Sequence, residues 1–334
     1  MRLRIAIVSL LVMVLTASAQ DFQIRTRVDL VVVPVTVKAS GDKLINGLQK
    51  DDFVVFEDGQ RQTITNFTSD PVPLSAAVVI DTGLSADSLA KVQQTFPALA
   101  GAFSQFDEVA AYRFDKDVVK LVDFTKNPEA LEAALKPVRE IKPDTRQALL
   151  PGGPFSTIGP MINGAAVVPP GQVGSPVTQN QPKIKVLNDA IYAAAADLEK
   201  RERNRRKIVL VVSDGVTNGS THSFQETVNS LLDFGIEVHA ITVDQTVLTK
   251  KFTSLNDYAK STGGDSYYVG SSIQSIETAY ARAAEQARNQ YVLGYVSENK
   301  PIGKEPIFRN IEVKLARADY ATLHRTGYYQ YPQD

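Results

Sequence analysis

Two aspartates and a serine are the residues whose types and spacing could bind a cation. Asp81 and Ser85 follow the apolar run Ala76–Ile80, and Asp214 follows a second apolar run, Ile208–Val212. Runs that are apolar on every side are typical of strands buried on both faces of a parallel sheet. The carboxyl ends of such strands meet at one sheet edge, where α/β proteins bind ligands. Carboxylate and hydroxyl oxygens at that edge are the ligands that Mg²⁺ prefers.

A second interpretation of the two aspartates is purely structural. An aspartate between a strand and a helix lies where its carboxylate can cap the helix N-terminus. On spacing alone, capping explains Asp81 and Asp214 better than cation binding does. A third run of the same design, 236–244, also ends in an aspartate, Asp244.

The elements that must position these residues form an α/β region over 71–289, flanked by β-rich segments at 22–70 and 290–334. The turn Asp58-Gly59 between two apolar β-branched runs predicts a hairpin in the first flank. We therefore expect a doubly wound, mostly parallel sheet of α/β class, with a second, smaller β-sandwich domain formed by both chain ends. Apolar periodicity predicts helices over 85–106 (kinked at Pro97), 127–136, 183–203, 223–234, 250–261 and 273–289, and a last strand over 321–329.

The segment 141–182 interrupts the α/β region. Pro, Gly, Gln and Ser dominate it, and no periodicity is visible. A loop of this length is either functional or disordered, and its composition favours a long flexible insertion.

The first residues predict export. Arg2 and Arg4 precede an apolar core at 5–15, and Ala17-Ser18-Ala19 forms a small-residue cleavage site. This pattern is typical of a signal peptide over 1–19; an uncleaved membrane anchor is the alternative. We expect a secreted or periplasmic protein without stable membrane insertion after cleavage. The absence of cysteine excludes disulfides, thiolate nucleophiles, zinc sites built on cysteine and a lipoprotein anchor.

Charge gives no indication of a nucleic-acid partner. The formal net charge is -1, so no global field attracts polyanions. The basic run Lys200–Lys207 could contact nucleic acid, but its place after a helix and before a buried strand favours a solvated turn. The three histidines lie far apart, and the sequence contains no phosphate-cradling or dinucleotide-binding loop.

Several segments together resemble a known family. Asp81–Ser85, Lys185–Ala194 and Val209–Gly215 are similar to the von Willebrand factor type A domain. The flanks Gly47–Phe67 and Tyr291–Tyr329 resemble the VWFA-related acidobacterial domain family, so the likeness covers nearly the whole mature chain except 141–182. The resemblance implies a doubly wound sheet with a metal-ion-dependent adhesion site. In that site two loop serines, a helix-opening threonine and two aspartates hold a cation, and an acidic group of a partner protein completes its coordination.

This chain departs from that pattern at two positions. Gly83 stands where the family has its first loop serine, and Lys185 stands where it has the helix-opening threonine. Asp81, Ser85 and Asp214 are kept. Mg²⁺ demands near-ideal octahedral geometry and gives up water reluctantly. We therefore expect a degenerate, vacant metal site and no cofactor, with Mg²⁺ or another divalent cation as the weaker alternative.

We hypothesise that the Lys185 ammonium replaces the metal. Two aspartates at one sheet edge repel each other, and a central positive charge relieves that repulsion. An ion pair at about 4 Å is worth roughly 4 kcal/mol at an effective dielectric near 20, and desolvation removes part of this gain. The alternative is that Lys185 points to solvent from the first helical turn.

These patterns predict an exported, non-catalytic protein-binding module of adhesion type, with a partner protein whose identity the residues do not specify. One alternative is a structural subunit of a cell-envelope assembly, held by β-edge pairing of its sandwich. A hydrolase using Asp81 and Asp214 is less favoured, because the sequence shows no pairing of a nucleophile with a base. We expect that the protein is not an enzyme.

Overall fold

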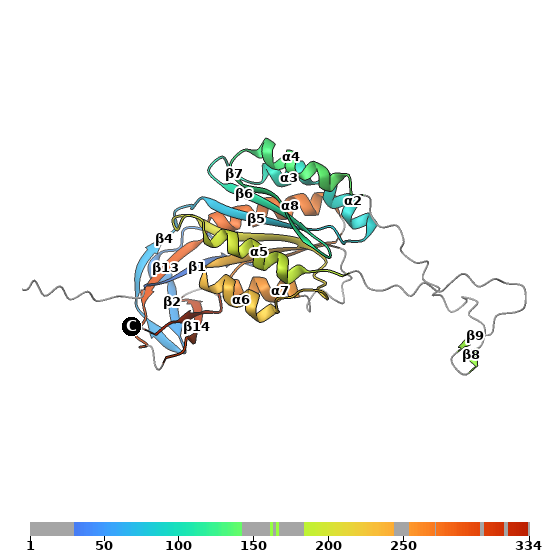
Figure 1. The fold of residues 1–334 in the computed structure, drawn as a ribbon. Coiled ribbons are helices and arrows are strands. Elements are labelled where there is room, and N and C mark those ends of the chain that lie inside the picture. The colour runs from blue at the N-terminus through green and yellow to red at the C-terminus, as the bar shows by residue number, and fades with distance from the viewer. Residues whose placement is uncertain are drawn as a thin grey trace, which may run out of the picture.

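A six-stranded sheet with helices on both faces forms the larger part of the molecule, and two small antiparallel sheets lie beside it (Figure 1). The computed structural model describes residues 30–141, 161–162, 165–166, 184–243, 254–270, 272–300, 304–316 and 320–332. The predicted fold class is confirmed. The predicted signal peptide and Asp244 lie outside the described residues.

The central sheet has the strand order β12-β11-β10-β5-β6-β7. Every neighbouring pair is parallel except β6 and β7, which are antiparallel. β5 and β10 lie side by side in the middle, so the residues that follow them meet at one edge. The strands are β5 (Leu74–Asp81), β6 (Glu108–Phe114), β7 (Val118–Thr125), β10 (Arg206–Ser213), β11 (Ile236–Val243) and β12 (Ser266–Gly270).

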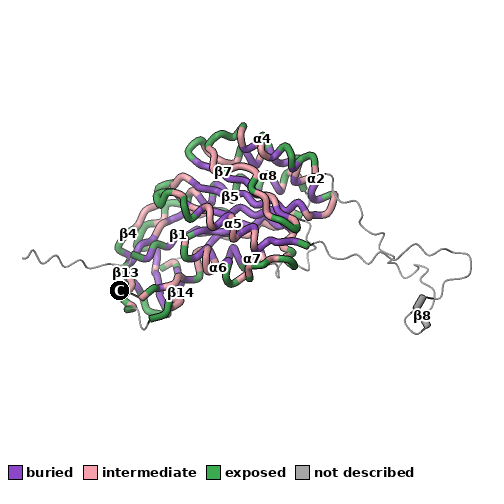
Figure 2. The backbone as a smooth tube through the Cα atoms, in the orientation of Figure 1, coloured by how far each residue is buried: buried purple, intermediate pink, exposed green. Residues whose placement is uncertain are grey.

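Helices cover both faces of this sheet, which explains why its central strands are apolar on every side (Figure 2). Ala76, Val78 and Ile80 pack in one core, and the alternate residues Ala77 and Val79 pack in the other. The first core is covered by α2 (Ala86–Gln94), α3 (Phe96–Gly101), α4 (Pro128–Arg139) and α8 (Ile273–Arg288), and the second by α5 (Leu187–Glu199), α6 (Phe224–Asp233) and α7 (Ser254–Thr262). None of the described helices combines the length and apolarity of a membrane span.

The two chain ends form the small sheets together, in the orders β15-β1-β13-β4 and β16-β14-β2-β3. Their apolar side chains share one core. Positive φ angles at Asp58 and Gly59 form the predicted hairpin turn. The elements are β1 (Leu30–Lys38), η1 (Lys50–Asp52), β2 (Phe53–Glu57), β3 (Gln60–Gln62), β4 (Ile64–Thr68), β13 (Tyr291–Val296), β14 (Ile307–Leu315), β15 (Ala321–Leu323) and β16 (Gly327–Gln330).

The helix predicted over 85–106 is two helices, and the second ends at Gly101. The break lies at Thr95, whose hydroxyl donates to the Val92 carbonyl, and Pro97 then sits in the first turn of α3. Proline has no N–H to bond to the preceding turn, so it favours a new helix start over a kink.

The strand predicted over 321–329 is also divided, because the chain changes sheets. β15 pairs with β1, whereas β16 pairs with β14 in the facing sheet. Gly327 permits the close approach at the start of β16, since a Cβ there would lie 2.2 Å from the carbonyl oxygen of Arg309. Alternating burial in β14 agrees with the predicted half-exposed antiparallel strand.

Within the predicted insertion 141–182 the structure describes Ile141 and one short antiparallel pair. The pair consists of β8 (Met161–Ile162) and β9 (Ala165–Ala166). The remaining residues of this segment lie outside the described ranges, so its predicted flexibility stays a prediction.

His324, between β15 and β16, gives the stability of the sandwich a pH dependence. Its Nε2 accepts a hydrogen bond from the Val313 N–H at 3.2 Å, and its Nδ1 bonds the Arg325 carbonyl at 2.8 Å, so both contacts suit the neutral ring. Burial lowers the pKa of His324. A lowered pKa gives stability that is present above the unfolded value and is lost as pH falls through the folded pKa.

We therefore expect the free energy of unfolding to fall between pH 7.5 and pH 5, values that bracket the ordinary histidine pKa of about 6.5. The variant His324→Gln, which cannot titrate, should show a shallower dependence. Urea unfolding of both proteins at the two pH values measures the difference. If the free energy of unfolding changes equally with pH in both proteins, His324 is not the source of the pH dependence.

Candidate functional site

The Lys185 ammonium lies between two carboxylates at the carboxyl edge of the central sheet. Its Nζ is 2.9 Å from Asp81 Oδ2 and 2.6 Å from Asp214 Oδ2. The side chains of Lys185 and Asp81 are 5% and 0% exposed, and that of Asp214 is 18% exposed. Three segments distant in sequence thus bring one positive and two negative charges into one largely buried cluster.

Hydrogen-bond donors surround Asp81, the last residue of β5. Its Oδ2 accepts from the Ser213 hydroxyl at 2.7 Å, and its Oδ1 accepts from the Gly83 N–H at 2.8 Å. Ser213 ends the adjacent strand β10. Both carboxylate oxygens therefore have partners before any ligand arrives, as a buried charge requires.

The electrostatics favour a charged lysine. Burial by itself lowers the pKa of Lys185, but the charges of Asp81 and Asp214 outweigh burial and raise it overall. Burial raises the pKa of Asp81, and the Lys185 ammonium opposes that shift. The lysine thus carries its charge at neutral pH and offsets part of the cost of burying the aspartates.

The backbone of Lys185 also forms hydrogen bonds with the loop after β10. Its N–H donates to Asn218 Oδ1 at 2.8 Å, and its carbonyl accepts from the N–H groups of Asn218 and Gly219, each at 3.1 Å. The predicted helix start was wrong: α5 begins at Leu187, so Lys185 precedes it in a segment tied to the loop after β10. Sequence reasoning also missed Ser213 and Asn218, although an Asn-Gly pair after a strand is a turn signal.

Gly83 makes room for the lysine. A Cβ at this position would lie 3.1 Å from Lys185 Cε and 3.2 Å from Asp81 Oδ1, which is tighter than ordinary contacts. A side chain at position 83 and the lysine at position 185 would therefore crowd each other, so Gly83 suits Lys185.

Ser85 does not join the cluster in any described contact. Its Oγ accepts a hydrogen bond from the Ser88 N–H at 3.3 Å and so caps α2. Capping is thus the role of the serine. Asp81 instead bonds Gly83, Ser213 and Lys185, and Asp214 accepts from the Val216 N–H at 2.9 Å.

These residues do not fit a divalent cation. The ammonium lies between the two carboxylates, Gly83 has no side-chain oxygen, and the Ser85 hydroxyl caps a helix. The part of the chain that the structure describes contains no group of three or more His, Cys, Asp or Glu side chains suited to a metal. Mg²⁺ would have to displace a salt-bridged lysine and then find its ligands among too few oxygens.

The basic run Lys200–Lys207 contains the predicted solvated turn, exposed at Lys200 and at 202–204, but two of its arginines form internal contacts. Arg201 forms a two-bond ion pair with Glu108, at 2.8 and 2.6 Å. Arg206 is buried and donates to the Ala287 carbonyl at 2.7 Å. Arg201 thus joins the turn before β10 to β6, and Arg206 joins the start of β10 to α8, because guanidinium groups can satisfy several acceptors at once.

Neither a protein-family model nor a curated protein sequence matches this chain. The solved structures to which it is similar include von Willebrand A-domain proteins. One is von Willebrand factor type A from Catenulispora acidiphila, 8% identical over 91% of this chain and 75% of that chain, with a TM-score of 0.45.

Two further solved structures are similar to this chain at comparable sequence identity and TM-score. One is the hypothetical protein BatB from Bacteroides thetaiotaomicron, 13% identical over 64% of this chain and 98% of that one, with a TM-score of 0.44. The other is proximal thread matrix protein 1 from the mussel byssus, with a zinc-occupied MIDAS motif: 14% identical over 69% of this chain, with a TM-score of 0.45. This chain spans 49% of that mussel protein's length.

Proposed function

We propose that this chain is an exported, non-catalytic protein-binding module of the VWFA-related type, which uses the carboxyl edge of its sheet without a metal ion. The observation that carries the proposal is the Lys185 ammonium held between Asp81 and Asp214. A salt-bridged ammonium offers no open coordination position, so an acidic group of a partner has no cation to complete. Recognition then depends on the surface around the cluster.

Two exposed apolar side chains flank the cluster and support this proposal. Ile184 precedes Lys185 and is 58% exposed; Val216 follows Asp214 by two residues and is 44% exposed. Gly219 lies against Ile184, so the loop after β10 and the segment before α5 form one surface. Contiguous apolar surface rimmed by polar residues marks protein contact sites.

The bonding of Asp81 supports a non-catalytic role. A general base must lie within reach of a substrate proton. The Asp81 side chain is fully buried and accepts three hydrogen bonds from the protein, so a substrate proton has no access to it. This carboxylate is therefore unsuited to hydrolysis.

The test is capture of a partner from the envelope or medium fraction of the source cells, with matched surface variants. We expect the parent to retain a defined protein in the presence of EDTA, and Val216→Asp to lose it. Val32→Asp, which alters an exposed valine of β1 on the sandwich, is the control and should retain it. Loss of capture in EDTA, or no effect of Val216→Asp, would refute the proposal.

The same experiment distinguishes a second candidate, a structural subunit of an envelope assembly. Leu30, Val32 and Val296 are 48%, 43% and 39% exposed. They belong to the paired strands β1 and β13, with Leu30 opposite Val296. An assembly that uses this sheet face would lose its partner in Val32→Asp and keep it in Val216→Asp.

A further inference from the structure

A groove of about 750 Å³ lies between the outer face of one sandwich sheet and the edge of the central sheet at which its strands begin. One wall comes from β1 and β13, and the other from the turn before β10, the end of α6 and the start of β11. The lysine cluster lies at the carboxyl edge, so the groove is a separate site. Its volume falls within the range of about 300–1,000 Å³ that is usual for small-ligand sites.

The sandwich wall of the groove is apolar and partly open to solvent. Leu30 and Val32 are 48% and 43% exposed. Pro34 and Val292, which lie opposite each other in the register of β1 and β13, are half-buried. Phe234, directly after α6, is half-buried in the opposite wall. Apolar surface gathered in a groove is typical of a ligand-binding site.

Arg325, between β15 and β16, contributes a positive charge with an unused hydrogen-bond donor. Its Cζ lies 5.6 Å from the centre of the Tyr328 ring, and no carboxylate of the described residues lies within 4 Å of its nitrogens. Its Nε is buried without a hydrogen-bond partner in the same part of the chain. Burial lowers the pKa of Arg325, although the charge of Glu237 opposes that shift. A buried N–H group without an acceptor is costly, and a carboxylate is an acceptor that suits a guanidinium.

The charges in the groove favour an anionic ligand. Its walls contain five arginines and lysines against three aspartates and glutamates. Arg205 forms an ion pair with Glu108 outside the walls, so one positive charge remains in excess. Glu237, the acid whose charge acts on Arg325, already accepts a hydrogen bond from Gln290 Nε2 at 2.8 Å.

The order of residues along β1 places the cation at one end of the apolar wall. β15 pairs with β1 as far as Thr36 opposite Leu323, and Arg325 follows two residues later, so it lies toward the Pro34 end. From Pro34 to Leu30 the exposure rises, over about 13 Å for four residues at about 3.3 Å each. The groove therefore has a cation at its deeper end and an apolar wall toward its open end.

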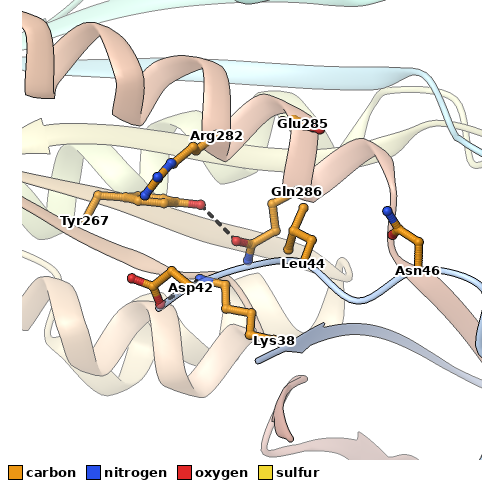
Figure 3. Close-up of a pocket in the computed structure, with 8 residues that line it drawn as sticks. All are labelled: Lys38, Asp42, Leu44, Asn46, Tyr267, Arg282, Glu285 and Gln286. Atoms are coloured by element: carbon orange, nitrogen blue, oxygen red, sulfur yellow. Dashed lines mark hydrogen bonds and ion pairs between the residues drawn. The ribbon is translucent and has the colours of Figure 1, made fainter. Parts of the chain in front are cut away.

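A smaller cavity of about 270 Å³, beside the loop after β1, lacks this separation (Figure 3). Lys38, Asp42 and Arg282 place charges of both signs around it. The residues of that cavity therefore indicate no ligand charge, whereas those of the groove do.

We propose that the groove binds a single-chain amphiphile with an anionic head, a medium-chain fatty acid. The Arg325 guanidinium binds the carboxylate at the deeper end, and the alkyl chain lies along Pro34, Val32 and Leu30. Binding removes the exposed apolar side chains from water and gives the guanidinium the acceptor that it lacks. This activity does not depend on the contact surface at the carboxyl edge.

The test is isothermal titration calorimetry of the full chain with decanoate, decan-1-ol and butanoate, each below the concentration at which it forms micelles or separates. We expect decanoate to bind with a Kd of about 0.1 mM or tighter. Decan-1-ol lacks the charge and butanoate lacks most of the chain, so each should bind at least about tenfold more weakly. No binding of decanoate, or equal binding of decan-1-ol, would overturn the proposal.

Matched variants locate the binding. Arg325→Gln should weaken decanoate binding by about tenfold or more, and Arg325→Lys should restore part of it. Val32→Asp, at an exposed position, should also weaken binding, because a carboxylate then lies beside the alkyl chain. Tyr320→Asp is the control: Tyr320 is 41% exposed and lies outside the groove walls, so the affinity should not change.

Unchanged decanoate affinity in either Arg325→Gln or Val32→Asp would overturn the proposal. Since Val32→Asp is expected to retain the captured partner protein, loss of decanoate binding and loss of capture are distinguishable.

Discussion

The double variant Gly83→Ser, Lys185→Thr is expected to bind Mg²⁺, which the parent should not bind. The two changes restore both hydroxyls that the family resemblance implies and remove the ammonium from between Asp81 and Asp214. Isothermal titration calorimetry should give saturable binding with a Kd of about 1 mM or tighter, equivalent to about −4 kcal/mol. Hydroxyl, carboxylate and water oxygens then supply the hard ligands that Mg²⁺ requires.

The single variants show whether the two positions are coupled. Gly83→Ser alone should be destabilised and should not bind Mg²⁺, because its Cβ would lie 3.1 Å from Lys185 Cε. Adding Ser85→Ala to the double variant should weaken Mg²⁺ binding, since Ser85 would leave its capping role to become a ligand. If the double variant binds Mg²⁺ no better than the parent does, the lysine does not stand in for a metal.

Lys185→Met is expected to destabilise the protein by about 3–5 kcal/mol, the typical cost of leaving a buried charge without its partner. Methionine fills a similar volume, so the loss of stability results from removing the positive charge and not from a cavity. Urea unfolding at neutral pH measures it. The control is Lys314→Met: Lys314 pairs with Glu312 on the surface and is 58% exposed, so its removal should change stability by less than about 1 kcal/mol.

The loss in Lys185→Met should depend on pH. Burial already raises the pKa of Asp81, and removing the ammonium leaves that rise unopposed. A carboxyl group with a raised folded pKa contributes stability at acidic pH that is lost as pH rises through the folded pKa. The free energy of unfolding of the variant should therefore approach that of the parent at acidic pH and be lower than it near neutral pH.

A second substitution separates charge from packing. Asp214→Asn in the Lys185→Met background removes one of the two negative charges and should restore part of the stability. A loss that stays constant across pH and is not relieved by Asp214→Asn would attribute the effect of Lys185→Met to packing alone.

The fold class could be predicted from the residues alone, because burial on two faces leaves a local pattern. The run Ala76–Ile80 is apolar at every position, since alternate residues face two different cores. The hairpin at Asp58-Gly59 was predictable for a different local reason: adjacent residues that tolerate positive φ angles set the turn. The ends of the apolar runs predicted the strand ends, and the strand ends predicted that Asp81 and Asp214 lie at the carboxyl edge of the sheet.

The contacts of the polar side chains could not be predicted in this way, because they depend on how distant segments meet. Lys185 and Arg206 are both basic residues next to a buried apolar segment, yet one pairs with Asp81 and the other with the Ala287 carbonyl. Ser85 caps a helix, while Ser213 bonds Asp81. The burial of an apolar run can be recognised from the spacing of its own residues. The partner of a charged side chain comes from a distant segment, which lies beside it only in the folded chain.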